Sequence, residues 1–491
     1  MSLRTWLLAP LLALPIAACG TTVPGAGEAA TSSGDGLGNG LTSSAGAALG
    51  AMGTSSPGGT TTRGVWSTIG NSQAGPTSTG GSAVGGRGTS TQDQGANASQ
   101  ANRIPVRVGV LYIDGAEAVA TNLGISGLST GDAMAQAKAI VTYLNAKGGL
   151  AGRPIQLCAG KMDAASAASN SEGAYAQACA SLTEDSKVTY VVSYVNLSES
   201  KLACYAKRGV TVLDDQSAVA DRAGAKYASV FGGPGELALG RAATELVDAL
   251  YRRGWLTARS KVGTVVPDTS DGAEIETHYL LPALKAHGLT PVASIRSTGT
   301  DTANQNANVV KFRSAGVDRV IPMGLSPLFL MNTAESQGYR PAYAVNSGFG
   351  PGALLETAAP KGQLRNAAGI GWSKYLDIGS GTKPGAVSSN ETLCFRLMRQ
   401  AGQQSTSGTT QAFQVALCNV LMYLKSASDQ YGVTPVLLDS VRSQGLRFLP
   451  ADAFSIRMVP GRADGIAAYR DVVFDEGCSC FQYVSGNRPT R

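Results

Sequence analysis

Polar side chains follow four of the strands that the sequence predicts, and their hydroxyl, amide and carboxylate groups are suited to binding a small polar molecule. In open parallel sheets, ligands bind beyond the carboxyl ends of the strands, where loops and helix N-termini converge. That rule selects Tyr112, Asp114, Asn196, Ser198, Gln216, Ser217, Asp268, Ser270 and Asp271. The loops with Phe349 and Trp372 are secondary candidates, because binding pockets also need apolar walls, although each aromatic side chain could instead pack in the core.

Two of these segments have a second explanation in helix capping. Asn196 and Ser198 precede a predicted helix, so their side chains and the helix amides could bind a ligand carboxylate. Ser198 taken alone is explained better as the N-cap of that helix. Asp268–Gly272 is likewise a good turn and helix cap as well as a candidate ligand loop.

The residues of common catalytic sites are poorly placed. His278 and His287 are the only histidines, and both fall within one predicted helix rather than in a strand-end loop. The sequence has no Gly-x-Ser-x-Gly turn, the Gly-rich segment 232–235 lacks the Lys of a phosphate-binding loop, and no cluster of His, Cys and acids has zinc spacing. We therefore expect a protein that is not an enzyme, with no catalytic residue, metal or cofactor.

The elements that must position the candidate site begin with one strand-helix-strand unit. Val106–Tyr112 is a predicted strand, and Thr130–Lys147 places apolar residues on one face of a predicted helix. Gly148 and Gly149 supply the backbone freedom that ends this helix, and Ile155–Cys158 has the length of a strand. The crossover between the two parallel strands is expected to be right-handed.

The alternation of strands and helices continues along the chain. Further strands are predicted at Val188–Ser193, Val210–Leu213, Val262–Val266, Pro291–Ile295, Asp318–Met323 and Ala342–Val345, with closing strands at Ile456–Val459 and Ala467–Phe474. Helices are predicted at Ser166–Leu182, Ser198–Lys207, Gly235–Arg253, Gly272–Ala286, Asn304–Ala315, Leu328–Gln337, Cys394–Gln400 and Thr409–Asp429. This spacing predicts an α/β fold of parallel sheets with helices on both faces.

Three features carry a resemblance to a known family. They are the opening strand Val-Arg-Val-Gly-Val-Leu, the turn Asn-Ala-Lys-Gly-Gly-Leu-Ala-Gly-Arg-Pro-Ile at 145–155, and Asp163 soon after it. Over roughly residues 103–480, the chain resembles the type I periplasmic binding proteins, most closely the branched-chain amino acid receptors of ABC transporters. The resemblance implies two lobes joined by three crossovers, with residues 103–231 and 376–447 in one lobe and 232–375 and 448–491 in the other.

The resemblance also assigns roles to loops, and the sequence departs from the family pattern in two of them. In the family, the loops at Asn196–Ser198 and Gln216–Ser217 hold the α-carboxylate of an amino acid. Here Asp214 and Asp215 precede Gln216, so either they point outward or the ligand is cationic, neutral or polyhydroxylated. The loop at 346–349 lacks the acid that commonly pairs with the ligand amine, and Asp268 or Asp271 could substitute.

The N-terminal region has the features of an exported lipoprotein. Residues 1–18 read as a signal peptide with a positive start and a short apolar core, and Ile16-Ala17-Ala18-Cys19 resembles a bacterial lipobox, which implies lipid attachment to Cys19. An ordinary signal peptide with a chance Cys is the alternative. Residues 19–102 are rich in Gly, Ser and Thr and predict a disordered tether. We expect the mature protein on the extracytoplasmic face of the cell membrane, held by acyl chains.

The other cysteines are expected to form disulfides, since an exported chain meets an oxidising compartment and no His accompanies them. The preferred pairs are Cys179 with Cys204 and Cys394 with Cys418. Cys478 and Cys480 could take Cys158 as a partner, although a Cys-x-Cys pair is also compatible with a soft-metal or redox element. Seven cysteines follow Cys19, so at least one thiol is expected to stay free or to pair between chains.

Composition and resemblance together predict a function. The net charge of +6 is dispersed, with no basic run, so a nucleic acid partner is not expected. We expect a lipid-anchored receptor that captures a small polar molecule, such as an amino acid or amide, between two lobes. The resemblance implies an ABC permease or a sensor protein as its partner. The alternative is a cell-envelope interaction lipoprotein, sensory or without a ligand, that keeps the same fold.

Overall fold

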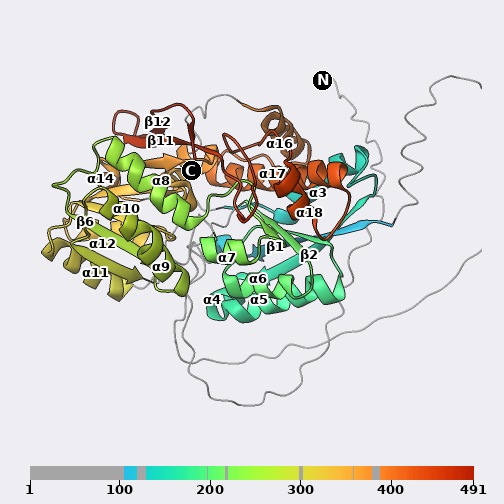
Figure 1. Cartoon of the computed structure of the whole chain (residues 1–491), viewed down its shortest axis with the longest axis horizontal. Helices are drawn as coiled ribbons and strands as arrows, with labels where there is room; N and C mark the ends of the chain where they lie inside the picture. Colours follow the sequence, from blue (N-terminus) through green and yellow to red (C-terminus); the bar gives the residue numbers. More distant parts are fainter. Residues whose placement is uncertain are drawn as a thin grey trace, which may run out of the picture.

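The computed structural model describes residues 104–118, 129–195, 197–215, 219–297, 302–357, 359–378 and 387–491, and this part of the chain forms two lobes, each built on its own β-sheet (Figure 1). We call the lobe that begins with the N-terminal strand the first lobe and the other the second lobe. The predicted two-lobed α/β architecture is therefore confirmed. The residue boundaries of the lobes given above stay a prediction.

The sheet of the first lobe is parallel throughout and has the strand order β2-β1-β3-β4-β5. Its strands are β1 (Val106–Asp114), β2 (Ile155–Asp163), β3 (Tyr190–Ser193), β4 (Thr211–Asp214) and β5 (Phe231–Gly232). Every residue of β3 and β4 is buried, because helices cover both faces of a parallel sheet and leave no face for water.

The helices of the first lobe come from two distant parts of the chain. The earlier group is α3 (Ala133–Ala146), α4 (Ala164–Ser169), α5 (Ser171–Ala180), the π-helical turn η2 (Ser181–Asp185), α6 (Glu199–Ala206) and α7 (Asp221–Lys226). The later group is α16 (Ser389–Gln400), α17 (Gly408–Tyr431) and α18 (Leu437–Gln444). The long helix α17 is buried along most of its length and contacts α3, β3 and β4, so the chain does return to this lobe.

The turn that carries the family resemblance owes its conformation to Asn145. The Asn145 side chain donates to the Ile155 carbonyl at 3.0 Å and accepts from the Ile155 amide at 2.7 Å, which ties the end of α3 to the start of β2. Gly149 has a positive φ of 65°, a region that glycine enters without steric cost. Local chemistry of this kind is visible in the sequence, so the order of the unit was predicted, although β2 extends to Asp163 rather than ending at Cys158.

The sheet of the second lobe has the order β12-β11-β10-β9-β8-β6-β7, with β13 paired to β11. Its strands are β6 (Val262–Pro267), β7 (Ala293–Ser297), β8 (Arg319–Pro322), β9 (Ala342–Asn346), β10 (Ala368–Gly371), β11 (Ala468–Asp475), β12 (Cys480–Tyr483) and β13 (Arg488–Pro489). β6 to β10 are parallel, whereas β11 and β12 run antiparallel at one edge. The sheet is thus parallel only in part.

Helices of the second lobe follow its strands in sequence. They are α8 (Leu239–Arg252), α9 (Ser270–Glu274), the π-helical turn η3 (Ile275–Leu280), α10 (Leu281–Ala286), α11 (Thr302–Ser314), α12 (Leu328–Ser336), the short 3-10 helix η4 (Ser347–Phe349), α13 (Pro351–Glu356), α14 (Lys361–Leu364) and α15 (Lys374–Ile378). Figure 1 shows α11, α12 and β6 in this lobe on the left, and β1, β2 and α5 in the first lobe on the right.

Three chain segments connect the lobes, as expected, and they are hydrogen-bonded to one another. Gly233 in the first segment forms a bridge with Asp464 in the third, and Ser373 in the second forms a bridge with Ala453 in the third. The Gly465 amide donates to the Gly233 carbonyl at 2.9 Å. The three crossovers therefore form one linked hinge region.

Two predicted elements were wrong in detail. The predicted helix Ser166–Leu182 is divided at Asn170, whose side chain accepts from the Gly173 amide at 3.0 Å and so begins a new helix, α5. The predicted strand Ile456–Val459 does not form, because only Ile456 pairs, in an isolated bridge with Ile466. The short elements α7, β5, α13, α14, α18, β12 and β13 were not predicted.

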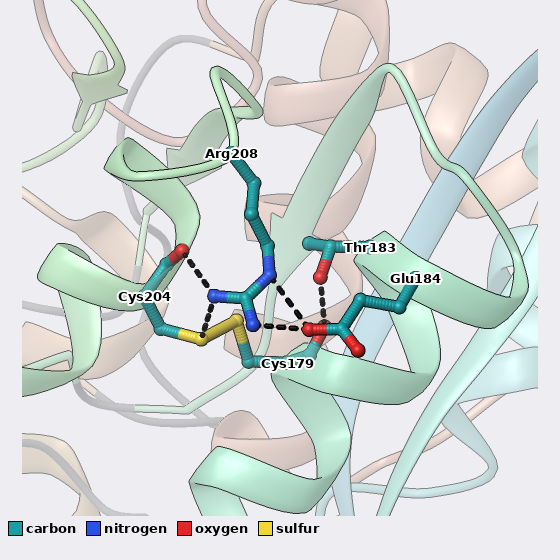
Figure 2. Close-up of a disulfide and its surroundings, with 5 residues drawn as sticks. All are labelled: Cys179, Thr183, Glu184, Cys204 and Arg208. Atoms are coloured by element: carbon teal, nitrogen blue, oxygen red, sulfur yellow. Dashed lines mark hydrogen bonds and ion pairs between the residues drawn. A yellow bond between two sulfur atoms is a disulfide. The ribbon is translucent and has the colours of Figure 1, made fainter.

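The two preferred disulfides are confirmed. Cys179 is bonded to Cys204, joining α5 to α6, and Cys394 is bonded to Cys418, joining α16 to α17. Figure 2 shows the first of these with Arg208, whose guanidinium donates to the Cys204 carbonyl at 3.1 Å and pairs with Glu184. This contact fixes the C-terminal end of α6.

The expected pairing of Cys158 with Cys478 or Cys480 is wrong, because those two cysteines are bonded to each other. None of the cysteines in the described residues is free, so the expectation of a free thiol is not met there. The lipidation site predicted at Cys19 lies outside the described residues. Across the ranges that the structure describes, no helix combines the length and apolar character needed to cross a bilayer.

Candidate functional site

The candidate site is formed where the strands of both sheets end, at the junction of the lobes. In the first lobe β1, β3 and β4 end at Asp114, Ser193 and Asp214, and in the second lobe β6 and β9 end at Pro267 and Asn346. Helices that follow these ends, α7 and α9, are joined across the lobes by an ion pair described below. This ion pair is a contact between the lobes near the strand ends, and the strand-end site itself stays a prediction.

The end of β1 presents Tyr112 and Asp114. Tyr112 is half-buried, and burial together with the Asp114 carboxylate raises the pKa of its phenol above the usual value. Asp114 is exposed and forms an ion pair with Lys161 of β2 at 2.5 Å. A ligand at this end would therefore meet a neutral phenol and a carboxylate that already has a cationic partner.

Tyr194, at the end of β3, packs in the core. Its hydroxyl donates to Gln136 Oε1 at 2.7 Å, and its ring stacks on Phe413 of α17 with 6.0 Å between centroids. Burial raises the pKa of Tyr194 well above its usual value. Tyr194 therefore belongs to the core of the first lobe.

Three predicted ligand residues, Asn196, Gln216 and Ser217, lie outside the described residues. Ser198 occupies the N-cap position of α6, as expected, but its side chain accepts no hydrogen bond from the helix amides. Its hydroxyl is instead 2.9 Å from the hydroxyl of Ser200. The Ser198 hydroxyl is therefore not committed to capping the helix.

Asp214 and Asp215 do not point outward, so that alternative is wrong. They are 0% and 6% exposed. Asp215 accepts from the Gly235 amide at 2.6 Å and from the side-chain amide of Asn419 in α17. Burial raises the pKa of Asp215 to about 7, although these hydrogen bonds act to lower it. The Asp215 carboxyl thus lies at the first crossover.

Glu236 and Asp452 extend this group of buried acids into the first and third crossovers. Burial and the neighbouring Asp215 raise the pKa of Glu236 well above its usual value. Burial raises the pKa of Asp452 to about 6, while hydrogen bonds from Ser373 and the Tyr375 amide oppose the shift. Burial is the main cause of these raised pKa values and the neighbouring acids add to it, so both effects favour the protonated carboxyls in the hinge region.

The loop after β6 contains three predicted ligand residues in different environments. Asp268 and Ser270 are exposed, and Asp271 is partly buried. Burial and the nearby carboxylates of Glu274 and Glu199 raise the pKa of Asp271. The cap of α9 is Thr269, whose hydroxyl accepts from the Gly272 amide at 3.1 Å. Capping therefore leaves the side chains of Asp268 and Ser270 available.

A groove of about 440 Å³ lies beside Ser270, between α7 and the α9–η3 segment. Arg222 of α7 spans it: the Arg222 amide donates to Glu274 at 3.0 Å, and the guanidinium pairs with the same carboxylate at 3.2 Å. His278 and Thr277 also line this groove. Arg222 is thus a direct link between the two lobes at the edge of the candidate site.

A second cavity, of about 390 Å³, lies between α7, the start of α8 and the loop 461–464. Asp221 lines it and accepts from the Gly240 amide, near the N-terminus of α8, at 2.6 Å. Burial raises the pKa of Asp221 to about 6. This contact also joins the lobes.

Phe349 and Trp372 are buried, at 2% and 1% exposure, and so present almost no surface to a ligand. Between them, the Ser347 hydroxyl donates to Asp377 at 2.6 Å and accepts from the Trp372 amide at 2.7 Å. Asn346 accepts from the Gly348 amide at 2.7 Å. The polar groups of the loop after β9 are therefore used in hydrogen bonds within the protein.

Glu356 was not predicted as a site residue, and its carboxylate accepts four hydrogen bonds from the other lobe. Its carboxylate, at the end of α13, accepts from the amides of Gly408 and Thr409 at 2.6 and 3.0 Å. The hydroxyls of Ser407 and Thr409 donate to it at 2.9 and 2.7 Å. The sequence Ser407-Gly-Thr-Thr is typical of a helix N-terminus, but nothing local identifies a partner from another lobe.

The histidines lie away from the candidate strand ends, apart from His278 in the groove. His287 follows α10, bonds to Asp248 at 2.6 Å and stacks on Tyr251 with 4.1 Å between ring centroids. In the part of the chain that the structure covers, no group of three or more His, Cys, Asp or Glu is arranged to hold a metal ion.

No family model matches the sequence, and no curated protein matches it. Solved structures do match. An ABC transporter substrate-binding protein from Desulfitobacterium hafniense, in complex with Leu, gives a TM-score of 0.52 at 14% identity and covers 78% of this chain and 100% of its own. A branched-chain amino acid ABC transporter protein from Thermus thermophilus, with bound valine, gives 0.54 at 12% identity and covers 79% and 96%.

A solute-binding protein from R. palustris in complex with 4-hydroxybenzoate is also similar, with a TM-score of 0.56 at 11% identity, covering 79% of this chain and 98% of its own. The fold is that of the type I periplasmic binding proteins, as the sequence resemblance implied. The neighbours named here are substrate-binding components of transporters, not enzymes.

Proposed function

We propose that this chain is a solute-binding protein that captures a small polar molecule between its two lobes for an ABC transporter. The observation that supports this most is a two-lobed fold with one linked hinge, in which α7 and α9 are joined across the lobes near the strand ends. A ligand that touches both lobes favours the closed form, because it gains contacts there that the open form lacks. The solutes bound by similar folds, Leu, valine and 4-hydroxybenzoate, suggest the size of the ligand.

The side chains that we propose to contact the solute come from the set predicted from the sequence. In the first lobe these are Tyr112 and Ser198, joined by Asn196, Gln216 and Ser217 of the predicted set. In the second lobe they are Ser270, Asp268 and Asp271. Asp268 and Asp271 would pair with an amine, since the loop after β9 offers no acid of its own. An amino acid, an amide or a related compound fits this set of groups.

We further propose that Cys19 carries acyl chains and holds the protein at the extracytoplasmic face of the cell membrane. A long Gly/Ser/Thr-rich segment between Cys19 and the first strand would give the lobes reach toward a permease or a sensor protein. Replacing Cys19 by Ala is expected to abolish metabolic labelling with palmitate. Labelling that persists in the variant would contradict the anchor.

A second candidate function is a sensory or ligand-free interaction lipoprotein. The observation that favours it is the set of direct contacts between the lobes, at Glu356, Asp221 and Arg222, together with the burial of Phe349 and Trp372. Lobes that are joined by their own side chains need less stabilisation of the closed form from a bound solute. A partner protein would then recognise the assembled surface.

Thermal unfolding against a panel of amino acids, amides, ureas, polyamines and sugars separates the two functions. A solute at a hundred times its dissociation constant stabilises the native protein by roughly 2.7 kcal/mol. The proposed function predicts a shift of the unfolding midpoint with one class of solute. The double variant Ser270→Ala, Tyr112→Ala should show a smaller shift with the same solute. Asp318→Asn, far from the strand-end loops, is the matched control. No shift with any class would favour the interaction lipoprotein.

A further inference from the structure

The hairpin between β11 and β12 contains a disulfide that closes a very small ring. Asp475 and Cys480 form the last antiparallel pair of the hairpin, and Cys478 is bonded to Cys480 across a single residue. That residue, Ser479, has a φ of 51°. The left-handed region costs a residue with a Cβ conformational energy, so the backbone of this ring is strained.

The other two described disulfides differ in both loop length and burial. Cys179–Cys204 and Cys394–Cys418 join residues 25 and 24 positions apart. Cys179, Cys394 and Cys418 are at most 1% exposed, whereas Cys204 is partly exposed. Stabilisation by a cross-link rises with the length of the loop that it closes. The Cys478–Cys480 bond therefore restricts the unfolded chain least of the three.

The hairpin is held together by other contacts as well. Phe481 is fully buried and packs edge-on against Phe474, with ring centroids 5.4 Å apart. The Asp475 carboxylate accepts from the Gly477 amide at 2.7 Å and from the side-chain amide of Gln482. None of these contacts is made by a sulfur atom of the disulfide, so we expect them to persist when the bond opens.

Solvent also reaches the Cys478–Cys480 bond more easily than the other two described disulfides. Cys478 is exposed at the tip of the hairpin, and Cys480 is partly exposed. A disulfide sulfur that solvent reaches can be attacked by a thiolate, whereas a buried one reacts only after local unfolding. Low stabilising value, a strained ring and an exposed sulfur occur together only at this one of the three described disulfides.

We propose that Cys478–Cys480 is a thiol–disulfide exchange site for low-molecular-weight thiols rather than a structural cross-link. A thiolate attacks Cys478 Sγ, the Cys478–Cys480 bond breaks, and Cys480 leaves as a thiolate that takes a proton from water. A second thiolate then attacks the sulfur of the first thiol, and Cys478 leaves as a thiolate that also takes a proton from water. The protein gains two electrons and two protons, and the two small thiols are released as their disulfide.

Differential alkylation of the folded protein tests this site. The full chain is incubated with 2-mercaptoethanol at neutral pH without denaturant, quenched with acid, alkylated and digested, and each cysteine is quantified by mass spectrometry. Cys478 and Cys480 should become alkylated at least about tenfold faster than the four cysteines of the other two pairs. Equal rates for the three disulfides, or slower reaction of Cys478 and Cys480, would overturn the proposal.

A pair of double variants tests the claim that the bond is not structural. Cys478→Ser with Cys480→Ser should leave the thermal unfolding midpoint unchanged within error. Cys394→Ala with Cys418→Ala is the matched comparison, and it should lower the midpoint clearly, because it removes a buried cross-link over a longer loop. A loss of stability in the hairpin variant as large as in the comparison variant would show a structural cross-link and contradict the proposal.

Discussion

The carboxylate of Glu356 in the second lobe accepts a hydrogen bond from the amide of Gly408, the first residue of α17 in the first lobe, at 2.6 Å. The arrangement is reciprocal, because Asp221 of the first lobe accepts from the amide of Gly240, near the start of α8 in the second lobe, at 2.6 Å. Helix N-termini carry free amides and a partial positive charge, so each is a good site for a carboxylate. Each lobe thus contributes an acid that binds a helix N-terminus of the other lobe.

Glu356→Ala is expected to loosen this connection. The variant leaves the first amides of α17 without their anion, and loss of a helix-capping acceptor costs about 1–2 kcal/mol. Chemical unfolding should report that loss of stability, and small-angle X-ray scattering should report a larger radius of gyration than in the parent protein. Glu335→Ala is the matched control, since Glu335 pairs with Arg340 within the second lobe. An equal change in radius for both variants would argue against a link between lobes.

Arg222→Ala should act on solute exchange more than on stability. The Arg222 side chain is 64% exposed, so its ion pair with Glu274 is worth less than about 1 kcal/mol. The pair nonetheless closes one edge of the strand-end site, and its loss should speed solute dissociation several-fold in stopped-flow measurements. Arg340→Ala removes a similarly exposed guanidinium from within one lobe and should leave the rate unchanged. Unchanged dissociation in Arg222→Ala would mean that this edge does not gate the site.

Stability should fall as pH rises through neutrality. Burial raises the pKa of Asp215 from 3.8 to about 7, so the folded protein holds a proton there that the unfolded chain has already released. The free energy of unfolding gained from this group is fully present below about pH 4 and is lost as pH rises through 7. Between pH 5 and 8 the loss should be on the order of 2 kcal/mol.

Urea unfolding at several pH values measures this dependence, and Asp215→Asn is the variant that isolates it. The amide cannot ionise, so the unfolding free energy of the variant should vary less between pH 5 and 8 than that of the parent protein. Asp318→Asn serves as the control and should keep the parent's slope. A parent protein that becomes more stable from pH 5 to 8 would contradict the assignment of buried, protonated acids to the hinge.

Gly369 of β10 should tolerate no side chain. A Cβ at this position would lie 1.7 Å from the carbonyl oxygen of Val345 in the neighbouring strand β9. Gly369→Ala must push these strands apart and should destabilise the protein by about 3 kcal/mol or more. Gly486→Ala, where a Cβ meets no atom within 4 Å, should change stability by less than about 0.5 kcal/mol. Similar unfolding midpoints for the two variants would show that the strand packing described here is wrong.

The fold was largely predictable because its signals are local. The helix before Asn145, the glycine turn and the strand after it follow from residues within a few positions of one another, and the disulfides of α5–α6 and α16–α17 follow from adjacent helices. The break at Asn170 and the absence of a strand at Ile456–Val459 were not predicted. The first depends on a cap inside an apparently continuous helix, and the second on which residues find a partner strand.

The contacts of the candidate site were harder to predict, because they join residues far apart in the chain. Glu356 and Gly408 are separated by 52 positions and Asp215 and Asn419 by 204. The sequence could identify a helix N-terminus at Ser407 but not the acid that reaches it. Nor could it distinguish exposed acids such as Asp268 from buried ones such as Asp215, since burial is set by the packing of α17 and the crossovers.

Hydrogen–deuterium exchange with and without a solute from the panel tests the central claim most directly. A solute held between the lobes should protect amides at the strand ends of both, in segments 112–118 and 193–200 of the first lobe and 268–274 of the second. Binding between the lobes predicts protection in both lobes with the same dependence on solute concentration. Protection confined to one lobe, or absent from these segments while the solute is bound, would contradict it.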